Sequence, residues 1–375
     1  MLSDTVHARE VGSVHDQLGA VMKHVDELLR LFLAELVGGA RADPFALRCG
    51  LAALDPASLT LFRTSADTNR VLPALGFVLD RGPGAENVPD EVRVPALQAW
   101  QANRLRNRVI VMIAGHVQQA LEAAGGEPIL YKGIHYVDWL WPDIGARRLQ
   151  DLDLVMPGFD VASAAAALRP LQFEPIDEPP SDAVHLRHPM GLEIDLHHRF
   201  RLFEGLDLAS AAVRYTPRFD PNGRWRVFEP ERELATLIHH HCSDHMEAEG
   251  ARLCWIADLA LRLRIAEHED IERVCALVGD VRRIQRISWL VALIQDALGV
   301  PLERWRRNLP PPREPADWAT VMASNRLLPF GLPRSRGWAR YVVSASQRWR
   351  HRWGPRPELA DLRRLPAVMR SLGGS

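Results

Sequence analysis

Apolar residues recur three or four positions apart through the first third of the chain, which is the spacing of amphipathic helices. This pattern predicts three helices, over residues 14–36, 57–79 and 96–124. Gly125 and Gly126 end the third helix, and the glycines and prolines of residues 81–95 are typical of a loop. Residues 1–125 are therefore predicted to form an N-terminal helical region.

The pattern changes at Glu127, where short apolar and alternating runs replace the helical spacing. Such runs are typical of strands, and they occur at residues 128–131, 149–156, 184–187 and 192–197. Helical stretches follow the first two runs, at residues 133–141 and 161–168, and residues 189–191 form the turn between the last two. A β–α–β pattern followed by an antiparallel pair predicts a small α/β core at residues 126–229.

Helical spacing returns at residues 231–241, 253–264 and 281–298, and the chain after residue 312 is rich in Arg and Trp. Residues 230–375 are therefore predicted to be a C-terminal helical region with a basic tail. The predicted fold class is α+β, with a small mixed sheet and its helices flanked by N- and C-terminal helical regions.

The composition is that of an ordinary soluble globular protein, with 47% hydrophobic and 25% charged residues. The formal net charge of -1 gives no overall attraction to nucleic acid or to an anionic membrane. The four cysteines are scattered without a Cys-x-x-Cys pair, which argues against a disulfide framework or a thiolate zinc site. The first twelve residues carry charges and no apolar run, and no later run suits a membrane span, so we expect a cytoplasmic protein.

Two carboxylates lie two residues apart in the strand predicted at residues 149–156. The strand period of two places Asp151 and Asp153 on one face, roughly 6–7 Å apart along the backbone, while Leu152 and Leu154 face the other side. Like charges on a buried strand are costly unless a cation neutralises them. Hard oxygen ligands favour Mg²⁺ or Mn²⁺ over zinc, and a pair of such ions can clamp both oxygens of a phosphoryl or nucleotidyl transfer.

The strand predicted at residues 192–197 supplies a third carboxylate. Asp195 lies between two apolar neighbours, and it could complete the metal site and accept the proton of an attacking hydroxyl. Glu193 lies on the same face and is an alternative for that role.

Cationic residues and a glycine precede the acidic pair. Lys132 and Gly133 lie where the first predicted strand ends and a helix begins, so backbone N–H groups and the Lys132 ammonium could bind a phosphate. Arg147 and Arg148 could bind phosphate bidentately or hold the carboxylates in place. An isolated Asp-x-Asp pair is common in strands, but this order of motifs is much more specific.

The stretch LYKGIHYVDWLWPDIGARRLQDLDLVM, followed by LEIDLHHRF, resembles the uncharacterised nucleotidyltransferase family with a KG…R…DxD…DxH signature. That family belongs to the DNA polymerase β-like superfamily. The likeness extends to the Asn-containing segment ANRLRNR and to a later His-containing helix followed by LCWIADL, and it covers most of residues 45–265.

The resemblance implies a nucleotidyltransferase core with Asp151 and Asp153 as metal ligands and Asp195 as the third carboxylate. Lys132 and Gly133 would stand where polymerase β-like enzymes carry a Gly-Ser pair over the phosphates. Arg147 fits the family's Arg four residues before the first Asp, and Arg148 is additional. The missing Gly-Ser hydroxyl matches the Lys-Gly branch of the superfamily.

The expected reaction transfers a nucleoside monophosphate from an NTP, with ATP among the candidates, to an acceptor and releases pyrophosphate. The acceptor could be a small molecule, a peptide or protein, or a tRNA. Two alternatives stay open, namely a kinase-like phosphotransferase on the same fold and a non-catalytic helical scaffold with a degenerate site. An intact set of acids with Lys132 speaks against the scaffold.

Two other features have rival interpretations. The cluster His239–His245 could place His241 and His245 on one helix face to bind a metal, but histidines that pack or line the cleft are favoured. His197 and His198 are expected to pack at a strand end, although His197 matches the family pattern and could touch substrate. The Arg- and Trp-rich tail at residues 334–352 could bind nucleic acid, but a solvated basic helix docked on this protein is favoured.

Overall fold

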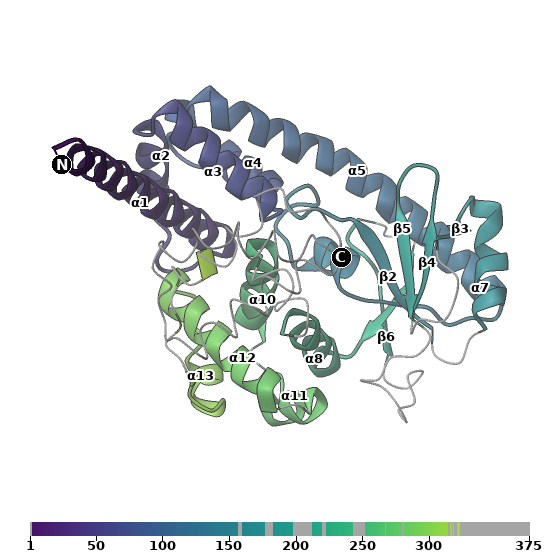
Figure 1. Ribbon diagram of the computed structural model, residues 1–375. Coiled ribbons are helices and arrows are strands. Elements are labelled where there is room, and N and C mark those ends of the chain that lie inside the picture. The colour runs from purple at the N-terminus through teal and green to yellow at the C-terminus, as the bar shows by residue number, and fades with distance from the viewer. Residues whose placement is uncertain are drawn as a thin grey trace, which may run out of the picture.

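Helices and a small sheet lie side by side in the computed structural model (Figure 1). The structure describes residues 2–156, 160–176, 183–197, 212–219, 223–242, 252–266, 268–279 and 281–313, together with residues 316, 318, 321 and 322, and it describes side chains from residue 20 onward. The basic tail and residues 198–211 and 243–251 lie outside the described residues.

Helices make up the chain before the sheet. They are α1 (Leu2–Val37), α2 (Pro44–Ala52), α3 (Pro56–Thr68), α4 (Leu72–Arg81), the short 3₁₀ turn η1 (Ala85–Asn87) and α5 (Asp90–Ala123). The predicted all-helical character of this region is confirmed. Helix α5 starts six residues earlier than predicted, with Asp90 and Glu91 in its first turn, where acidic side chains interact favourably with the helix dipole.

The helix predicted over residues 57–79 is two helices, so that prediction was wrong at its centre. Asn69 follows α3, and Arg70 has a φ of 60°, which turns the backbone out of the helical path. The Asn69 side chain donates to the Ser65 carbonyl (2.9 Å) and accepts the N–H of Leu253 (3.3 Å). The break therefore joins the N-terminal helices to the start of the distant helix α10 (Leu253–Ile265).

The central segment carries two sheets. Its elements are β1 (Ile129–Leu130), α6 (Gly133–Trp139), β2 (Asp151–Val155), α7 (Val161–Leu168), the 3₁₀ turn η2 (Arg169–Leu171), β3 (Glu174–Pro175), β4 (Ala183–Arg187), β5 (Glu193–His197), β6 (Ala212–Tyr215) and β7 (Trp225–Phe228). The larger sheet has the strand order β1-β2-β5-β4-β3, and β6 pairs with β7. Strands β3, β6 and β7 were not predicted.

The strand pairing differs from the simplest interpretation of the sequence. Strands β4 and β5 are antiparallel, as predicted, and Gly191 in the turn between them has a φ of 79° that favours glycine. Strands β1 and β2 are also antiparallel, although α6 lies between them. The parallel pair is β2 with β5, and this pair places Asp153 directly beside Asp195.

The helices after the sheet are α8 (Pro230–His241), α10, α11 (Ile271–Val278), α12 (Val281–Leu293), the π-helical segment η4 (Ile294–Leu298) and α13 (Glu303–Asn308). They share one hydrophobic core with α1 to α4 and the first half of α5. A second core lies between the sheet, α7 and the second half of α5. Figure 1 shows α5 running from the helical part to the sheet. The N- and C-terminal helical regions pack in one core, so they are not separate in the structure. The predicted domain boundaries at residues 125 and 229 stay a prediction.

The second core fixes which face of the sheet carries polar groups. Leu152, Leu154, Ile194 and Leu196 are at most 1% exposed, and they lie in one cluster with Val117 of α5 and Leu168 of α7. Since side chains alternate along a strand, the acids of β2 and β5 share the opposite face. The predicted α+β class is confirmed.

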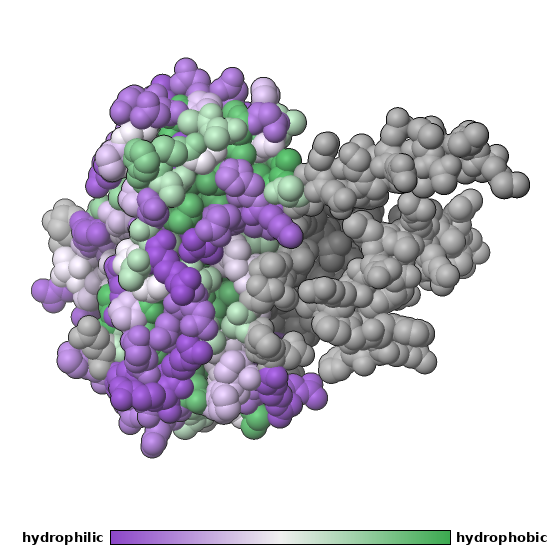
Figure 2. Space-filling view, turned by 90° about the vertical axis from the view of Figure 1, so that its left-hand side faces the viewer, coloured by the Kyte–Doolittle hydropathy of each residue, from purple (hydrophilic) through white to green (hydrophobic). Residues whose placement is uncertain are grey.

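One face of the protein is mixed in hydropathy. Figure 2 shows a face on which hydrophilic residues predominate in the lower part and hydrophobic residues gather in the upper part. Among the helices of the described residues, none combines the length and the apolar composition needed to cross a membrane.

Candidate active site

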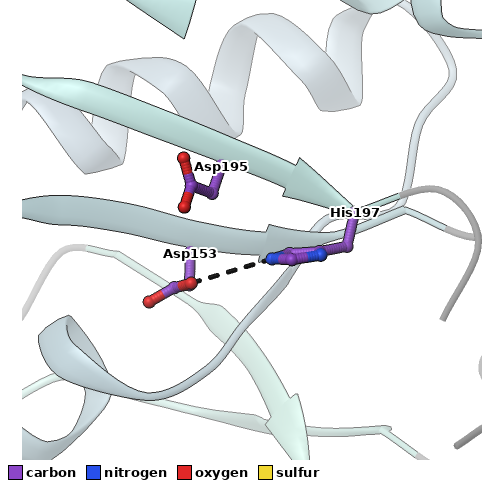
Figure 3. Close-up of side chains that lie close together, drawn as sticks. All are labelled: Asp153, Asp195 and His197. Atoms are coloured by element: carbon purple, nitrogen blue, oxygen red, sulfur yellow. Dashed lines mark ion pairs between the residues drawn. The ribbon is translucent and has the colours of Figure 1, made fainter. Parts of the chain in front are cut away.

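The polar face of β2 and β5 brings the predicted carboxylates together. The two strands are parallel, with Asp151 opposite Glu193 and Asp153 opposite Asp195. Ligand atoms of Asp153, Asp195 and His197 all lie within 4.8 Å of one another, which makes them a candidate metal site (Figure 3). Sequence reasoning favoured packing for His197, whereas the structure places His197 Nε2 3.8 Å from Asp153 Oδ1.

The two candidates for the third carboxylate have different surroundings. Asp195 Oδ1 lies 2.7 Å from Nδ1 of His185, which belongs to the neighbouring strand β4. Glu193 accepts a hydrogen bond from Nε of Arg187 (2.9 Å) and lies opposite Asp151 rather than Asp153. The structure therefore groups Asp195 with the candidate metal ligands and leaves Glu193 at the edge of the face.

Lys132 forms an ion pair with Asp153. Its Nζ lies 2.9 Å from Asp153 Oδ1, and it also lies 4.6 Å from the centre of the Tyr131 ring. The backbone of Lys132 has a φ of 54° and a ψ of -132°, a conformation that L residues rarely adopt and that costs on the order of 1–3 kcal/mol. Strained backbone at a cluster of charged groups is typical of functional sites.

The charges of this face are only partly balanced. Burial raises the pKa of Asp151, and the carboxylates of Asp153 and Asp195 add to the effect, so that the pKa reaches about 7. Burial acts in the same direction on Asp153, but Lys132 and His197 outweigh it and lower the pKa of Asp153 to about 2. One lysine therefore neutralises one aspartate, and among the described residues Asp151 has no equivalent cationic partner in direct contact.

Arg147 has a different neighbour from the one that the sequence suggested. Its Nε and a terminal nitrogen donate to the two carboxylate oxygens of Asp258 in α10, both at 2.8 Å. Asp258 is 0% exposed, and it also accepts the indole N–H of Trp141 (2.7 Å). The pairing of Arg147 with Asp258 spans 111 residues of sequence, and sequence reasoning missed it because no local pattern links two residues so far apart.

The close approach of Arg147 favours a glycine at position 133. A Cβ atom at Gly133 would lie 3.0 Å from a terminal nitrogen of Arg147 and 3.2 Å from a methyl group of Leu149. A larger residue would therefore push the guanidinium away from its place beneath the start of α6. The Lys-Gly and Arg motifs of the signature are thus in direct contact.

The segment before β2 is held by helix α5. The Asn103 amide donates to the carbonyls of Gly145 (2.7 Å) and Arg147 (2.9 Å), and the Asn107 amide donates to those of Ile144 (2.6 Å) and Arg147 (2.8 Å). Residues four positions apart share one helix face, so both amides reach the same segment. The spacing of the two asparagines in ANRLRNR was the signal that could have predicted this contact.

Arg148 lies apart from Arg147, in a cleft of about 540 Å³ beside the carboxylates. This cleft is also lined by Asp151, Glu193 and Arg106 of α5. The guanidinium of Arg148 lies 3.7 Å from Asp67, and both side chains are largely exposed. The structure therefore separates the two arginines that the sequence placed together.

The described part of the histidine cluster packs in the protein. His241 is buried, stacks on Trp255 with a ring separation of 5.6 Å, and lies 3.7 Å from Asp258. Burial lowers the pKa of His241, which favours its neutral form. His245, the second half of the predicted metal pair, and His198 lie outside the described residues.

Comparison with known proteins identifies the family. The model of the uncharacterised nucleotidyltransferase family matches residues 56–296, which is more than half of the chain. The chain belongs to this family. A solved structure of an antigenic nucleotidyltransferase-like protein from Paracoccidioides brasiliensis is 18% identical, covers 52% of this chain and 92% of its own, and superposes with a TM-score of 0.32. A search of curated proteins finds no match.

Family membership confirms the resemblance carried by the KG…R…DxD…DxH signature and the expected nucleotidyltransferase core. The acids of this family member fit a divalent cation. Asp153 and Asp195 offer oxygen ligands on adjacent strands, and the raised pKa of Asp151 reflects negative charge that a cation would offset. Carboxylate oxygens suit Mg²⁺ or Mn²⁺, and one histidine in the set is compatible with Mn²⁺.

Proposed function

We propose that this nucleotidyltransferase moves a nucleoside monophosphate from an NTP to an acceptor hydroxyl, phosphate or amine and releases pyrophosphate. The observation that carries the proposal is the register of β2 and β5, which places Asp153 beside Asp195 and Asp151 beside Glu193 on one polar face of the sheet. Family membership supports the same reaction class. A structural role alone gives no reason to keep like charges together at this position.

In this proposal Asp151, Asp153 and Asp195 hold Mg²⁺ or Mn²⁺, with His197 beside them. The bound cations supply positive charge that offsets the negative charge on the reacting phosphate oxygens. Asp195 also accepts the proton of the acceptor, and the hydrogen bond between its Oδ1 and His185 holds its carboxylate in place. Glu193 is less suited to this role, because Arg187 already binds it.

Lys132 and Gly133 contact the triphosphate in this proposal. Lys132 lies at the start of α6, and its ammonium already pairs with Asp153 on the acidic face. The missing Cβ at Gly133 makes room for the Arg147 guanidinium, so the turn that carries Lys132 packs directly on Arg147. Arg147 supports this turn from beneath through its contact with Gly133, while Asp258 holds its guanidinium. Arg148 is directed to the neighbouring cleft.

The proposal is tested by calorimetric binding of each of the four NTPs with Mg²⁺, followed by product analysis. We expect Mg²⁺-dependent binding of at least one NTP to wild type, and a loss of about 100-fold or more in Asp153→Asn, because that change removes a charged ligand from the centre of the site. Asp80→Asn is the matched control, since Asp80 is exposed on α4. Full NTP binding and activity in Asp153→Asn would reject the site, and release of NDP instead of pyrophosphate would reject nucleotidyl transfer in favour of phosphoryl transfer.

A further inference from the structure

The cleft beside the carboxylates has a cationic wall. Arg106 of α5 and Arg148 both line it. Arg106 donates an N–H to the carbonyl of Leu149, which fixes the position of its guanidinium. Leu149 precedes Asp151 by two residues, so this anchor lies roughly 6–7 Å along an extended chain from the first carboxylate.

Arg106 and Arg148 line the same cleft, so their positive charges repel each other. Partial burial lowers the pKa of Arg106, and the positive charge of Arg148 lowers it further. Two cations that lie together at the wall of a cleft favour an anion between them, because the anion relieves their repulsion and accepts charge-assisted hydrogen bonds from both.

The acids of the cleft leave this pair available. Asp67 is 3.7 Å from Arg148, with side-chain exposures of 61% and 43%, and a surface pair of this kind contributes little. Glu193 is bound by Arg187, outside the arginine pair. The remaining acid of the lining is Asp151, which is itself one of the proposed metal ligands and precedes Asp153 on the same face of β2.

The size of the cleft suits a small molecule. Its volume of about 540 Å³ lies within the range of roughly 300–1,000 Å³ that is usual for small-ligand pockets. Ala99 and Ala102 of α5 contribute small side chains to its lining, so part of the wall is apolar. The cleft therefore combines a cationic pair, an apolar part and one end at the proposed catalytic carboxylates.

We propose that this cleft binds the acceptor, and that the acceptor is a small molecule with a phosphate or carboxylate group. Arg106 and Arg148 hold that anionic group, and the reacting hydroxyl or amine lies at the Asp151 end of the cleft. This inference rests on the proposed function, and it assigns Arg148 to the acceptor rather than to the triphosphate.

The test measures the binding of inorganic phosphate to the full chain without Mg²⁺, by NMR titration or calorimetry. A second series of measurements uses acetate in place of phosphate. We expect at least one of the two anions to bind wild type and to bind about tenfold more weakly in Arg106→Gln and in Arg148→Gln. Arg108→Gln is the matched control on the same helix, and its affinity should stay within about twofold of wild type. Asp67→Asn should strengthen binding, because it removes the acid that competes for Arg148.

Arg148 is largely exposed, so its substitution keeps the test informative even if Arg106→Gln disturbs the fold. Binding that is lost in Lys132→Met but unchanged in Arg106→Gln and Arg148→Gln would place the anion at the triphosphate site and overturn the inference. Binding of neither anion would overturn it as well. The Asp67→Asn result separates a binding role from a structural one, since loss of a stabilising pair would not raise affinity.

The two proposals fail in different ways. If an NTP binds as proposed while the cleft variants leave anion affinity unchanged, only the acceptor assignment is rejected. If the anion binds through Arg106 and Arg148 but wild type binds no NTP, the transfer reaction is rejected and the cleft is an anion site of another kind.

Discussion

Asp258 in the helical part is fully buried, whereas Asp151 at the start of β2 is half-buried, and the charges of the two side chains meet opposite surroundings. Asp258 receives two hydrogen bonds from Arg147 and one from Trp141. Burial alone would raise the pKa of Asp258, but Arg147 and His241 outweigh it and lower the pKa to about 2. Asp151 lies among other acids, and its pKa is raised to about 7. Within the part of the chain that the structure describes, the charge of Asp258 is balanced by Arg147, and the charge of Asp151 has no such partner.

This difference distinguishes a structural acid, Asp258, from a candidate ligand-binding acid, Asp151. Asp258 connects α10 to the segment before β2 and, through Arg147, to Gly133 at the start of α6. Asp151 lines a cleft, and it makes no comparable connection to any residue that the structure describes. Perturbed acids in a cleft are candidates for function, whereas fully partnered buried acids are more often structural.

The largest expected effect on stability is the loss of Asp258. Asp258→Ala leaves the Arg147 guanidinium buried without its carboxylate, and we expect the free energy of unfolding to fall by about 3–5 kcal/mol. Asp151→Ala removes a charge that its neighbours repel, and we expect it to leave the stability unchanged or raise it in metal-free protein. Urea unfolding of both variants measures the contrast. An equal fall in the free energy of unfolding of the two variants would contradict the proposed difference between Asp258 and Asp151.

A smaller effect is expected from acid. Because the pKa of Asp258 is lowered from 3.8 to about 2, its ionised form contributes about 2 kcal/mol of stability that is present above about pH 4 and is lost as the pH falls toward 2. Asp258→Asn lacks this contribution at every pH. The stability difference between wild type and Asp258→Asn should therefore shrink between pH 5 and pH 2.5 in urea unfolding. A difference that stays constant across this range would contradict the prediction.

The smallest effect concerns metal at the acidic face. We expect Mg²⁺ or Mn²⁺ at about ten times its dissociation constant to stabilise wild type by roughly 1.4 kcal/mol, since ligand binding to the folded state adds to its stability. Asp195→Asn should lose most of this gain, whereas Asp258→Asn should keep it because Asp258 lies outside the candidate ligand set. Thermal unfolding with and without the cation measures both. A gain that Asp195→Asn retains would exclude Asp195 as a ligand.

Local pattern was sufficient to predict much of the acidic face. The period of two placed Asp151 and Asp153 together, and the strands found at β2, β4 and β5 lie within about a residue or two of the predicted runs. Helix α7 was predicted with its observed bounds. These features depend on neighbours in sequence, which is the information that periodicity carries.

The contacts that arrange the site join residues far apart in the sequence. The partner of Arg147 is 111 residues away, and the break between α3 and α4 is fixed by a contact from Asn69 to Leu253, 184 residues away. The hydrophobic periodicity reports local structure, so it cannot predict either of these long-range contacts. The antiparallel pairing of β1 with β2 was likewise hidden, because a helix between two strands usually signals a parallel pair.

Helix α5 belongs to both cores, and this sets an order of events during synthesis. The half of the helix that covers the sheet, ending near Leu121, is made before any of the strands that it contacts. Leu196 of β5 follows Leu121 by 75 residues, which at ribosomal speeds corresponds to roughly 4–15 s. For that interval the growing chain carries an apolar helix face without its partner, so the newly made helix is the part of this protein that chaperones have most reason to hold.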